Sequence, residues 1–193
     1  MRHSEEITPE CFDVICNNFR ELRRLDMRHL DKLTNVDGVK LNLLKQLEYL
    51  RISGTAGLTD LISSEDVSAS SLKTLNVSGV MTGVALANYV ARHPHLENLF
   101  INSRLLTDDT LICILGRKPH LRRLVLHYCP QLTDRSLRAL GNLCPQLRWL
   151  CVELCPGMTD RGLSHLRETI PLAVCSSSFL DFSFLVRVYH PST

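Results

Sequence analysis

The sequence lacks any long apolar run, and no stretch reaches the roughly eighteen apolar residues that a membrane-spanning helix requires. Its first residues, Met1-Arg-His-Ser-Glu-Glu, also lack the apolar run of a secretory signal. These absences predict a protein that neither crosses a membrane nor enters the secretory pathway. We therefore expect a cytoplasmic localisation, with the nucleus as the alternative.

The sequence also lacks an excess of charge of one sign. Its 22 Lys and Arg residues nearly balance its 20 Asp and Glu residues, and the formal net charge is only +2. A nucleic acid or an anionic membrane surface attracts proteins through a strong positive field, which this balance does not supply. We expect no nucleic-acid partner and no membrane partner.

Motifs of the common enzyme and metal sites are absent as well. There is no Gly-rich phosphate loop, no Gly-x-Ser-x-Gly and no His-Glu-x-x-His. Side chains of zinc-ligand type do occur near the C-terminus, at Cys151, Cys155, His165 and Cys175. Structural zinc sites usually show two close pairs of ligands, which this spacing does not provide. We predict no catalytic residue, no cofactor and no metal; a cysteine hydrolase or zinc protein is the minor alternative.

The eight cysteines are an even number, which is compatible with a disulfide framework. Disulfides persist in oxidising compartments, and the sequence has no secretory signal. Several of the cysteines also stand at positions where apolar residues occur in other parts of the chain. Reduced thiols are the expected state.

What the sequence does have is a segment that repeats at a fixed offset. Leu121-Arg-Arg-Leu-Val-Leu-His-Tyr-Cys-Pro-Gln-Leu-Thr-Asp134 is followed by Leu147-Arg-Trp-Leu-Cys-Val-Glu-Leu-Cys-Pro-Gly-Met-Thr-Asp160, 26 residues later (147 − 121). Every apolar position of the first copy is apolar in the second. A fixed period of this length predicts a solenoid, in which each repeat buries its apolar face against its neighbours.

Six repeats begin at an apolar anchor, and the positions three and five residues after each anchor are also apolar. The anchors are Leu22, Leu47, Leu72, Leu96, Leu121 and Leu147. Alternation with period two predicts a short strand with one buried face in each repeat. Because about twenty residues separate consecutive strands, these strands are expected to lie parallel, with a helical crossover between them.

A threonine precedes the helical part of each repeat and can accept a backbone N–H of the first helical turn. These threonines are Thr8, Thr34, Thr59, Thr82, Thr107, Thr133 and Thr159. The predicted fold class is therefore α/β: a curved parallel sheet of about six strands on the concave side of a solenoid, with helices on the convex side.

The frame Leu-x-x-Leu-x-Leu-x-x-Cys, followed by Leu-Thr-Asp, resembles the cysteine-containing leucine-rich repeat of the F-box and leucine-rich-repeat receptors of ubiquitin ligases. The resemblance covers residues 8 to 170. It implies that Cys129 and Cys155 are packing residues, and that the module binds a protein substrate on its concave face. No F-box is found in this sequence, so a ligase adaptor is expected to bind only through an N-terminal region missing from it.

The repeat pattern sets the domain boundaries. We expect a leucine-rich-repeat domain over residues 1–170, with a partial first repeat, and a tail or degenerate cap over residues 171–193. The pattern fails after Pro171, because Ala173, Ser176 and Ser178 occupy the positions where leucines are expected. A poorly ordered or loosely packed tail is favoured over a final edge strand that acts as a cap. The chain opens on the second half of a repeat, which suggests a shortened product of a longer chain.

Residues just before, between and after the two inner apolar positions of each strand point away from the core and form columns along the stack. Aromatic and arginine side chains in these columns are typical of protein interfaces. The predicted protein-binding residues are Arg24, Asp26, Tyr49, Arg51, Asn98, Phe100, Arg123, Val125, His127, Trp149 and Glu153. The structural alternative is that Phe100 and Val125 pack on each other and Trp149 covers the end of the solenoid.

Two functions follow from these observations. The first is a protein-binding module that recognises substrates for a cullin-RING ligase of the SCF type. The alternative is an intracellular leucine-rich-repeat scaffold or inhibitor with no role in ubiquitin transfer.

Overall fold

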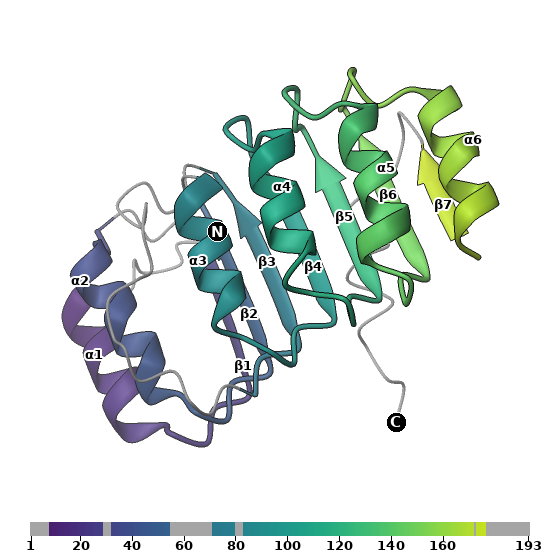
Figure 1. Ribbon diagram of the computed structural model, residues 1–193. Helices are drawn as coiled ribbons and strands as arrows, with labels where there is room; N and C mark the ends of the chain where they lie inside the picture. Colours follow the sequence, from purple (N-terminus) through teal and green to yellow (C-terminus); the bar gives the residue numbers. More distant parts are fainter. Residues whose placement is uncertain (1–7, 29–31, 55–70, 80–82, 172, 177–193) are drawn as a thin grey trace.

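The computed structural model describes residues 8–28, 32–54, 71–79, 83–171 and 173–176, and within them one parallel sheet runs the length of the molecule. Its strands lie in sequence order: β1 (Arg24–Arg28), β2 (Tyr49–Ser53), β3 (Thr74–Ser78), β4 (Asn98–Asn102), β5 (Arg123–His127), β6 (Trp149–Glu153) and β7 (Ala173–Ser176). Figure 1 shows the strands side by side.

Helices cover one face of this sheet (Figure 1). They are α1 (Pro9–Asn18), α2 (Asn35–Gly38) with the 3-10 turn η1 (Val39–Leu43), α3 (Gly83–Ala91), α4 (Asp108–Leu115), α5 (Asp134–Leu143) and α6 (Asp160–Thr169). The predicted α/β solenoid, with a curved parallel sheet on the concave side and helices on the convex side, is confirmed. No helix in the described ranges has the length and apolarity that crossing a membrane demands.

Threonines begin the helices as predicted. The Oγ1 atoms of Thr8, Thr107 and Thr159 accept the backbone N–H groups of Cys11, Thr110 and Gly162, respectively, at 3.2–3.4 Å. Each such bond satisfies a donor of the first turn that has no partner within its helix. Thr133 caps α5 in the same way, and Thr34 forms a reciprocal capping box with Asp37. Thr59 and Thr82 lie outside the described residues.

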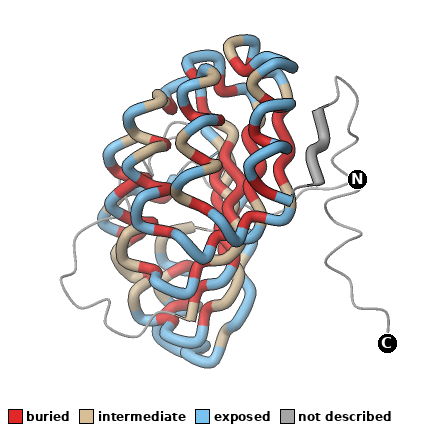
Figure 2. The backbone as a smooth tube through the Cα atoms, turned by 45° about the vertical axis from the view of Figure 1, so that its right-hand side comes forward, coloured by how far each residue is buried: buried red, intermediate tan, exposed pale blue. Residues whose placement is uncertain are grey.

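The leucines of the strands form a continuous core between sheet and helices. All the predicted inner strand positions are buried except Leu25 of β1, which is partly buried. Figure 2 shows these buried positions gathered where strands and helices face each other. Because the side-chain period of a strand is two residues, a register slip of one residue would turn every one of these leucines to the opposite face.

The sheet continues beyond residue 170. Strand β7 pairs with β6 in parallel, with Trp149 opposite Ala173 and Val152 opposite Ser176. This register places Pro171, not residue 173, at the position of the anchor Leu147 (147 + 173 − 149 = 171). The preference for a tail without a strand was therefore wrong for residues 173–176; the rest of the predicted tail, residues 177–193, lies outside the described residues. The proposed boundary at 170 stays a prediction.

Carboxylates bridge successive repeats in the C-terminal half of the solenoid. Asp108 of α4 accepts hydrogen bonds from the backbone N–H and the hydroxyl of Thr133 at 3.0 and 2.6 Å, and also from the Ser136 hydroxyl. Asp134 of α5 holds Thr159 in the same way, at 2.7 Å to each atom. Each carboxylate therefore fixes the threonine that begins the next helix, and these hydrogen bonds hold the pKa of Asp108 below its usual value despite partial burial.

Candidate functional site

The sheet face opposite the helices is the candidate site, and we call it the concave face. Its side chains come from the first, third and fifth positions of β1 to β6. The strand register pairs these positions directly, for example Arg24 with Tyr49 and Arg123 with Trp149. The predicted binding residues therefore lie in the predicted columns on one surface, although their role in binding stays a prediction.

Charged side chains occupy the N-terminal end of the concave face. The Arg24 guanidinium lies over the Tyr49 ring, 5.0 Å from its centre, an arrangement in which the ring face attracts the cation. Asp26 is shared by two arginines: its carboxylate lies 3.0 Å from Arg28 Nε and 3.9 Å from an Nη atom of Arg51. Three arginines with one aspartate leave this end of the face with a net positive charge.

Apolar side chains form a second cluster at the C-terminal end of the concave face. Phe100, Val125 and Cys151, from three neighbouring strands, are 6%, 5% and 3% exposed, and Trp149 packs against them, partly buried. This cluster is separate from the main core. Phe100 and Val125 therefore pack on each other, as the structural alternative proposed. Of this group, only Trp149 offers substantial surface to a partner.

Polar contacts also join neighbouring strands of the concave face. The Asn102 amide lies 2.9 Å from Nδ1 of His127, and Nε2 of the same ring lies 4.0 Å from the Glu153 carboxylate. Asn98 donates to the Thr74 hydroxyl at 3.1 Å on the neighbouring strand. Each contact joins two adjacent repeats, so these residues are held in defined positions before any partner binds.

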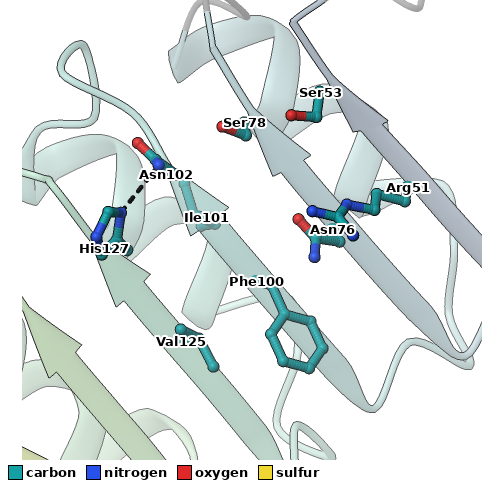
Figure 3. Close-up of a pocket in the computed structure, with 9 residues that line it drawn as sticks. All are labelled: Arg51, Ser53, Asn76, Ser78, Phe100, Ile101, Asn102, Val125 and His127. Atoms are coloured by element: carbon teal, nitrogen blue, oxygen red, sulfur yellow. Dashed lines mark hydrogen bonds between the residues drawn. The ribbon is translucent and has the colours of Figure 1, made fainter. Parts of the chain in front are cut away.

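A cavity of about 220 Å³ opens in the middle of the concave face (Figure 3). It is lined by Arg51, Ser53, Asn76, Ser78, Phe100, Ile101, Asn102, Val125 and His127. The predicted binding residues include Arg51, Phe100, Val125 and His127. The two serines and two asparagines stand in the predicted columns but were not chosen as binding residues, because small polar side chains are common and only the structure shows that they line a cavity.

Tyr128 and Leu154 are two further exposed residues that the sequence reasoning missed. They follow β5 and β6 directly, and each adopts a positive φ, 50° and 53°. Gly54 and Gly79 follow β2 and β3 with the same sign of φ. A left-handed backbone is unfavourable for residues with a Cβ, so the chain holds Tyr128 and Leu154 in a costly conformation at the rim of the concave face. Gly54 and Gly79 stand at the equivalent position of earlier repeats, and they were the sequence signal that the backbone has a positive φ there.

Five of the seven described cysteines are buried, and none of the seven is paired in a disulfide. Cys129 and Cys155 are buried, and their thiols point to backbone carbonyls, for instance Cys155 to Glu153 at 3.3 Å. The neighbouring Cys155 thiol and burial raise the pKa of Cys129, and burial raises the pKa of Cys144 to about 12. A high thiol pKa opposes thiolate chemistry. Within the described ranges, no three His, Cys, Asp or Glu side chains are grouped as metal ligands.

No protein-family model matches the sequence, and no curated protein matches it. Among solved structures, a chain from the crystal structure of the yeast Rad7 and Elc1 complex is similar, with a TM-score of 0.70 and 24% identity. The alignment covers 88% of this chain and 46% of that one, so this chain spans about half the length of its structural relative. The fold is that of a leucine-rich-repeat solenoid.

A looser likeness joins the chain to the structure of a TLR13–ssRNA13 complex. The TM-score is 0.48 and the identity 21%, over 84% of this chain and 26% of that one. This second likeness adds nothing to the fold assignment.

Proposed function

We propose that this chain is a protein-binding module that uses its concave face to recognise a substrate protein for a cullin-RING ubiquitin ligase of the SCF type. The observation that supports the binding role is the concave face itself, where Arg24, Tyr49, Arg123 and Trp149 lie in one column of six in-register strands. Aromatic and arginine side chains supply most of the binding energy in protein interfaces. Solenoids present extended concave surfaces of this kind to their ligands.

The ligase role rests on the resemblance of the repeats to the cysteine-containing subtype. Cys129 and Cys155 occupy the cysteine position of successive repeats, and both are buried against carbonyl groups of the sheet. The similar yeast chain comes from a complex of Rad7 with Elc1, and a protein partner is likewise proposed here. Because these 193 residues contain no F-box, the adaptor of the ligase would bind another part of the protein.

The alternative is an intracellular scaffold or inhibitor that binds a protein on the same face without any role in ubiquitin transfer. Affinity purification of the longest natural form from cells separates the two. Recovery of cullin and its adaptor proteins supports the ligase role, and their absence from a purification that recovers a concave-face partner contradicts it.

The binding face is tested by replacing single residues in that purification. Trp149→Ala and Arg123→Ala are expected to lower partner recovery at least about tenfold, the loss that removal of an interface hot spot causes. We expect Arg123→Ala to change the free energy of unfolding by about 1 kcal/mol or less, and Trp149→Ala to lower it by about 1–3 kcal/mol without unfolding the protein, because the ring packs against the Phe100 cluster.

The matched control for Arg123→Ala is Arg138→Ala, which removes the same charge from an exposed position of α5 on the convex side. Partner recovery is expected to be unchanged in this control. Equal losses from both arginine variants would contradict a concave binding face, and so would unfolding of the Trp149→Ala protein.

A further inference from the structure

The cavity in the concave face has a chemistry of its own, set by hydrogen-bond donors without partners. Arg51 makes an ion pair with Asp26 at 3.9 Å, too long for a hydrogen bond. Its Nε atom is buried and has no acceptor among the described residues. Leaving a buried donor unsatisfied costs about 1–3 kcal/mol. The Arg51 side chain as a whole is 25% exposed, so an acceptor that enters the cavity can reach its guanidinium.

Three more polar side chains in the cavity wall are partly exposed and free to bind a ligand. Ser53, Asn76 and Ser78 form no side-chain hydrogen bond in the part of the chain that the structure describes. Ser53 and Ser78 are register neighbours on β2 and β3, and Asn76 is the register partner of Arg51. Figure 3 shows the two hydroxyls at one end of the cavity and the Arg51 side chain beside Asn76.

The donors surround a space that suits one side chain. At about 220 Å³ the cavity is smaller than the roughly 300–1,000 Å³ of sites that hold cofactors or drug-sized ligands. Phe100, Ile101 and Val125 form its apolar wall. The space suits a side chain that ends in one polar group and has a short apolar part or an apolar neighbour. Its polar group would lie toward Arg51 and its apolar part against Phe100.

The charge near the cavity indicates which kind of polar group would bind there. Arg28 and Arg51 share the single carboxylate of Asp26, so the balance at this end of the cavity is one net positive charge. A carboxylate carries one negative charge and matches this balance, and two parallel N–H donors of a guanidinium fit its two oxygens. A phosphorylated side chain carries about −1.5 to −2 charges, which exceeds the balance.

We propose that this cavity binds the carboxylate of a Glu or Asp side chain that is flanked by an apolar residue in an extended segment of the partner protein. The inference deepens the proposed function, and rests on it, because it names the chemical class that the concave face recognises. Arg51 binds the carboxylate, while Ser53, Ser78 and Asn76 donate to its remaining lone pairs.

Three fluorescein-labelled peptides test the proposal by fluorescence polarisation: Gly-Ser-Leu-Glu-Leu-Ser-Gly and the same peptide with Gln or phosphoserine in place of Glu. The Glu peptide is expected to bind roughly tenfold more tightly than the Gln peptide, the difference that a charge-assisted hydrogen bond makes. Arg51→Gln should remove this preference. Ser53→Ala with Ser78→Ala should reduce it severalfold while leaving every charge in place.

Arg23→Gln is the matched control. It makes the same change of charge in the neighbouring repeat, at a side chain that is 71% exposed, pairs with Glu48 at 3.5 Å and does not line the cavity. The preference for Glu is expected to survive in this variant. Circular dichroism of each variant verifies that the fold is retained, and the serine variant stands in if Arg51→Gln does not fold.

Several results would overturn the proposal. These are equal affinity for the Glu and Gln peptides, no detectable binding of either at millimolar concentration, tighter binding of the phosphoserine peptide, or a preference that persists in both cavity variants. The sequence Phe179-Leu-Asp181-Phe also holds a carboxylate between apolar residues. An Asp181→Asn variant that binds the Glu peptide several times more tightly would assign the cavity to this segment of the chain instead of a partner.

The same variants separate this proposal from the proposed function. If a partner purified from cells is lost with Trp149→Ala but retained with Arg51→Gln, the concave face binds protein and the carboxylate proposal fails. If the Glu peptide binds as expected but no partner depends on Trp149 or Arg123, the cavity is confirmed and the proposed function fails.

Discussion

The two halves of the solenoid share one strand frame but differ in how neighbouring repeats are joined. In the C-terminal half, Asp108 and Asp134 each bind the threonine of the following repeat. In the N-terminal half, Asp37 instead binds Thr34 of its own repeat, at 2.9 and 3.0 Å. The helix there is also shorter: α2 has 4 residues before the chain continues as a 3-10 turn, whereas α5 and α6 have 10 each.

The concave face follows the same division. The C-terminal half carries the buried Phe100 cluster, and the N-terminal half carries Asp26, Arg51 and the small polar side chains that line the other side of the cavity between them. Among the described residues, carboxylates at helix starts bind the threonine of the next repeat in the half whose surface is already packed, while the unpaired donors of the cavity lie toward the other half. This comparison suggests that the N-terminal half provides the polar chemistry of recognition and the C-terminal half provides the stable platform beside it.

The largest expected effect tests whether the core is equivalent in both halves. Leu50 of β2 and Leu124 of β5 occupy the same position in their repeats, and both are 0% exposed. Replacing either leucine with alanine should lower the free energy of unfolding by about 2–5 kcal/mol, from lost apolar burial and the cavity that remains. Urea denaturation measures both. A cost well below this range at Leu50 alone would show that the N-terminal core is loosely packed.

The next effect concerns the junction of the halves, where the Lys118 ammonium donates to the His93 backbone carbonyl at 2.8 Å and both residues are buried. Burial, with Lys118 nearby, lowers the pKa of His93 to about 4 from its ordinary 6.5. Between these two values the unfolded state binds more protons than the folded state, so stability should fall as pH falls from 6.5 to 4. The loss is at most about 3 kcal/mol for a shift of this size.

Urea denaturation across this pH range checks the prediction by comparing the wild-type protein with His93→Phe. The variant should lack the part of the acid slope that His93 causes. Identical slopes in the two proteins would show that His93 is hydrated or titrates normally in the folded state.

A smaller effect is expected from breaking one bridge between repeats. Asp134→Ala removes both hydrogen bonds to Thr159 and should cost about 1–3 kcal/mol. Native-state hydrogen exchange should show faster exchange in α6, which the bridge holds. By contrast, Asp37→Ala should affect only the helix of its own repeat.

Asp160→Ala is the control for Asp134→Ala. Asp160 takes the same place at the start of α6, is exposed, and forms no hydrogen bond among the described residues. Asp160→Ala should leave exchange in the neighbouring helix α5 unchanged. Faster exchange in α5 after Asp160→Ala, equal to that in α6 after Asp134→Ala, would mean that loss of a first-turn charge and not of the bridge is responsible.

The smallest effect is expected at the edge of the N-terminal half, where Glu48 lies 3.5 Å from Arg23 and 3.2 Å from Lys73 on adjacent repeats. Exposed ion pairs contribute about 0–1 kcal/mol each and weaken with salt. Glu48→Gln should therefore change the unfolding free energy by about 1 kcal/mol or less, with the difference vanishing in high salt. A larger, salt-independent loss would show that Glu48 fixes the register.

The features that the sequence predicted correctly are those that recur at the same position in each repeat. Strand positions and their register follow from leucines with a period of two inside a fixed repeat, because only one alignment buries all of them. Thr8, Thr34, Thr107, Thr133 and Thr159 were recognisable because a threonine before an apolar helical pattern has a specific capping role. The seventh strand was missed because Pro171, and not a leucine, takes the anchor position of its repeat. Without an anchor leucine, the sequence pattern does not show where the strand begins.

The sequence alone thus determined a parallel solenoid, the face on which each strand residue lies and the threonines that begin the helices, since each depends on neighbours within one repeat. Only the tertiary structure decided that Phe100 and Val125 are buried, that Asp108 and Asp134 bridge repeats, and that Arg51, Ser53, Asn76 and Ser78 surround one cavity. These features depend on distances between residues about 25 positions apart, and curvature and side-chain conformation set those distances.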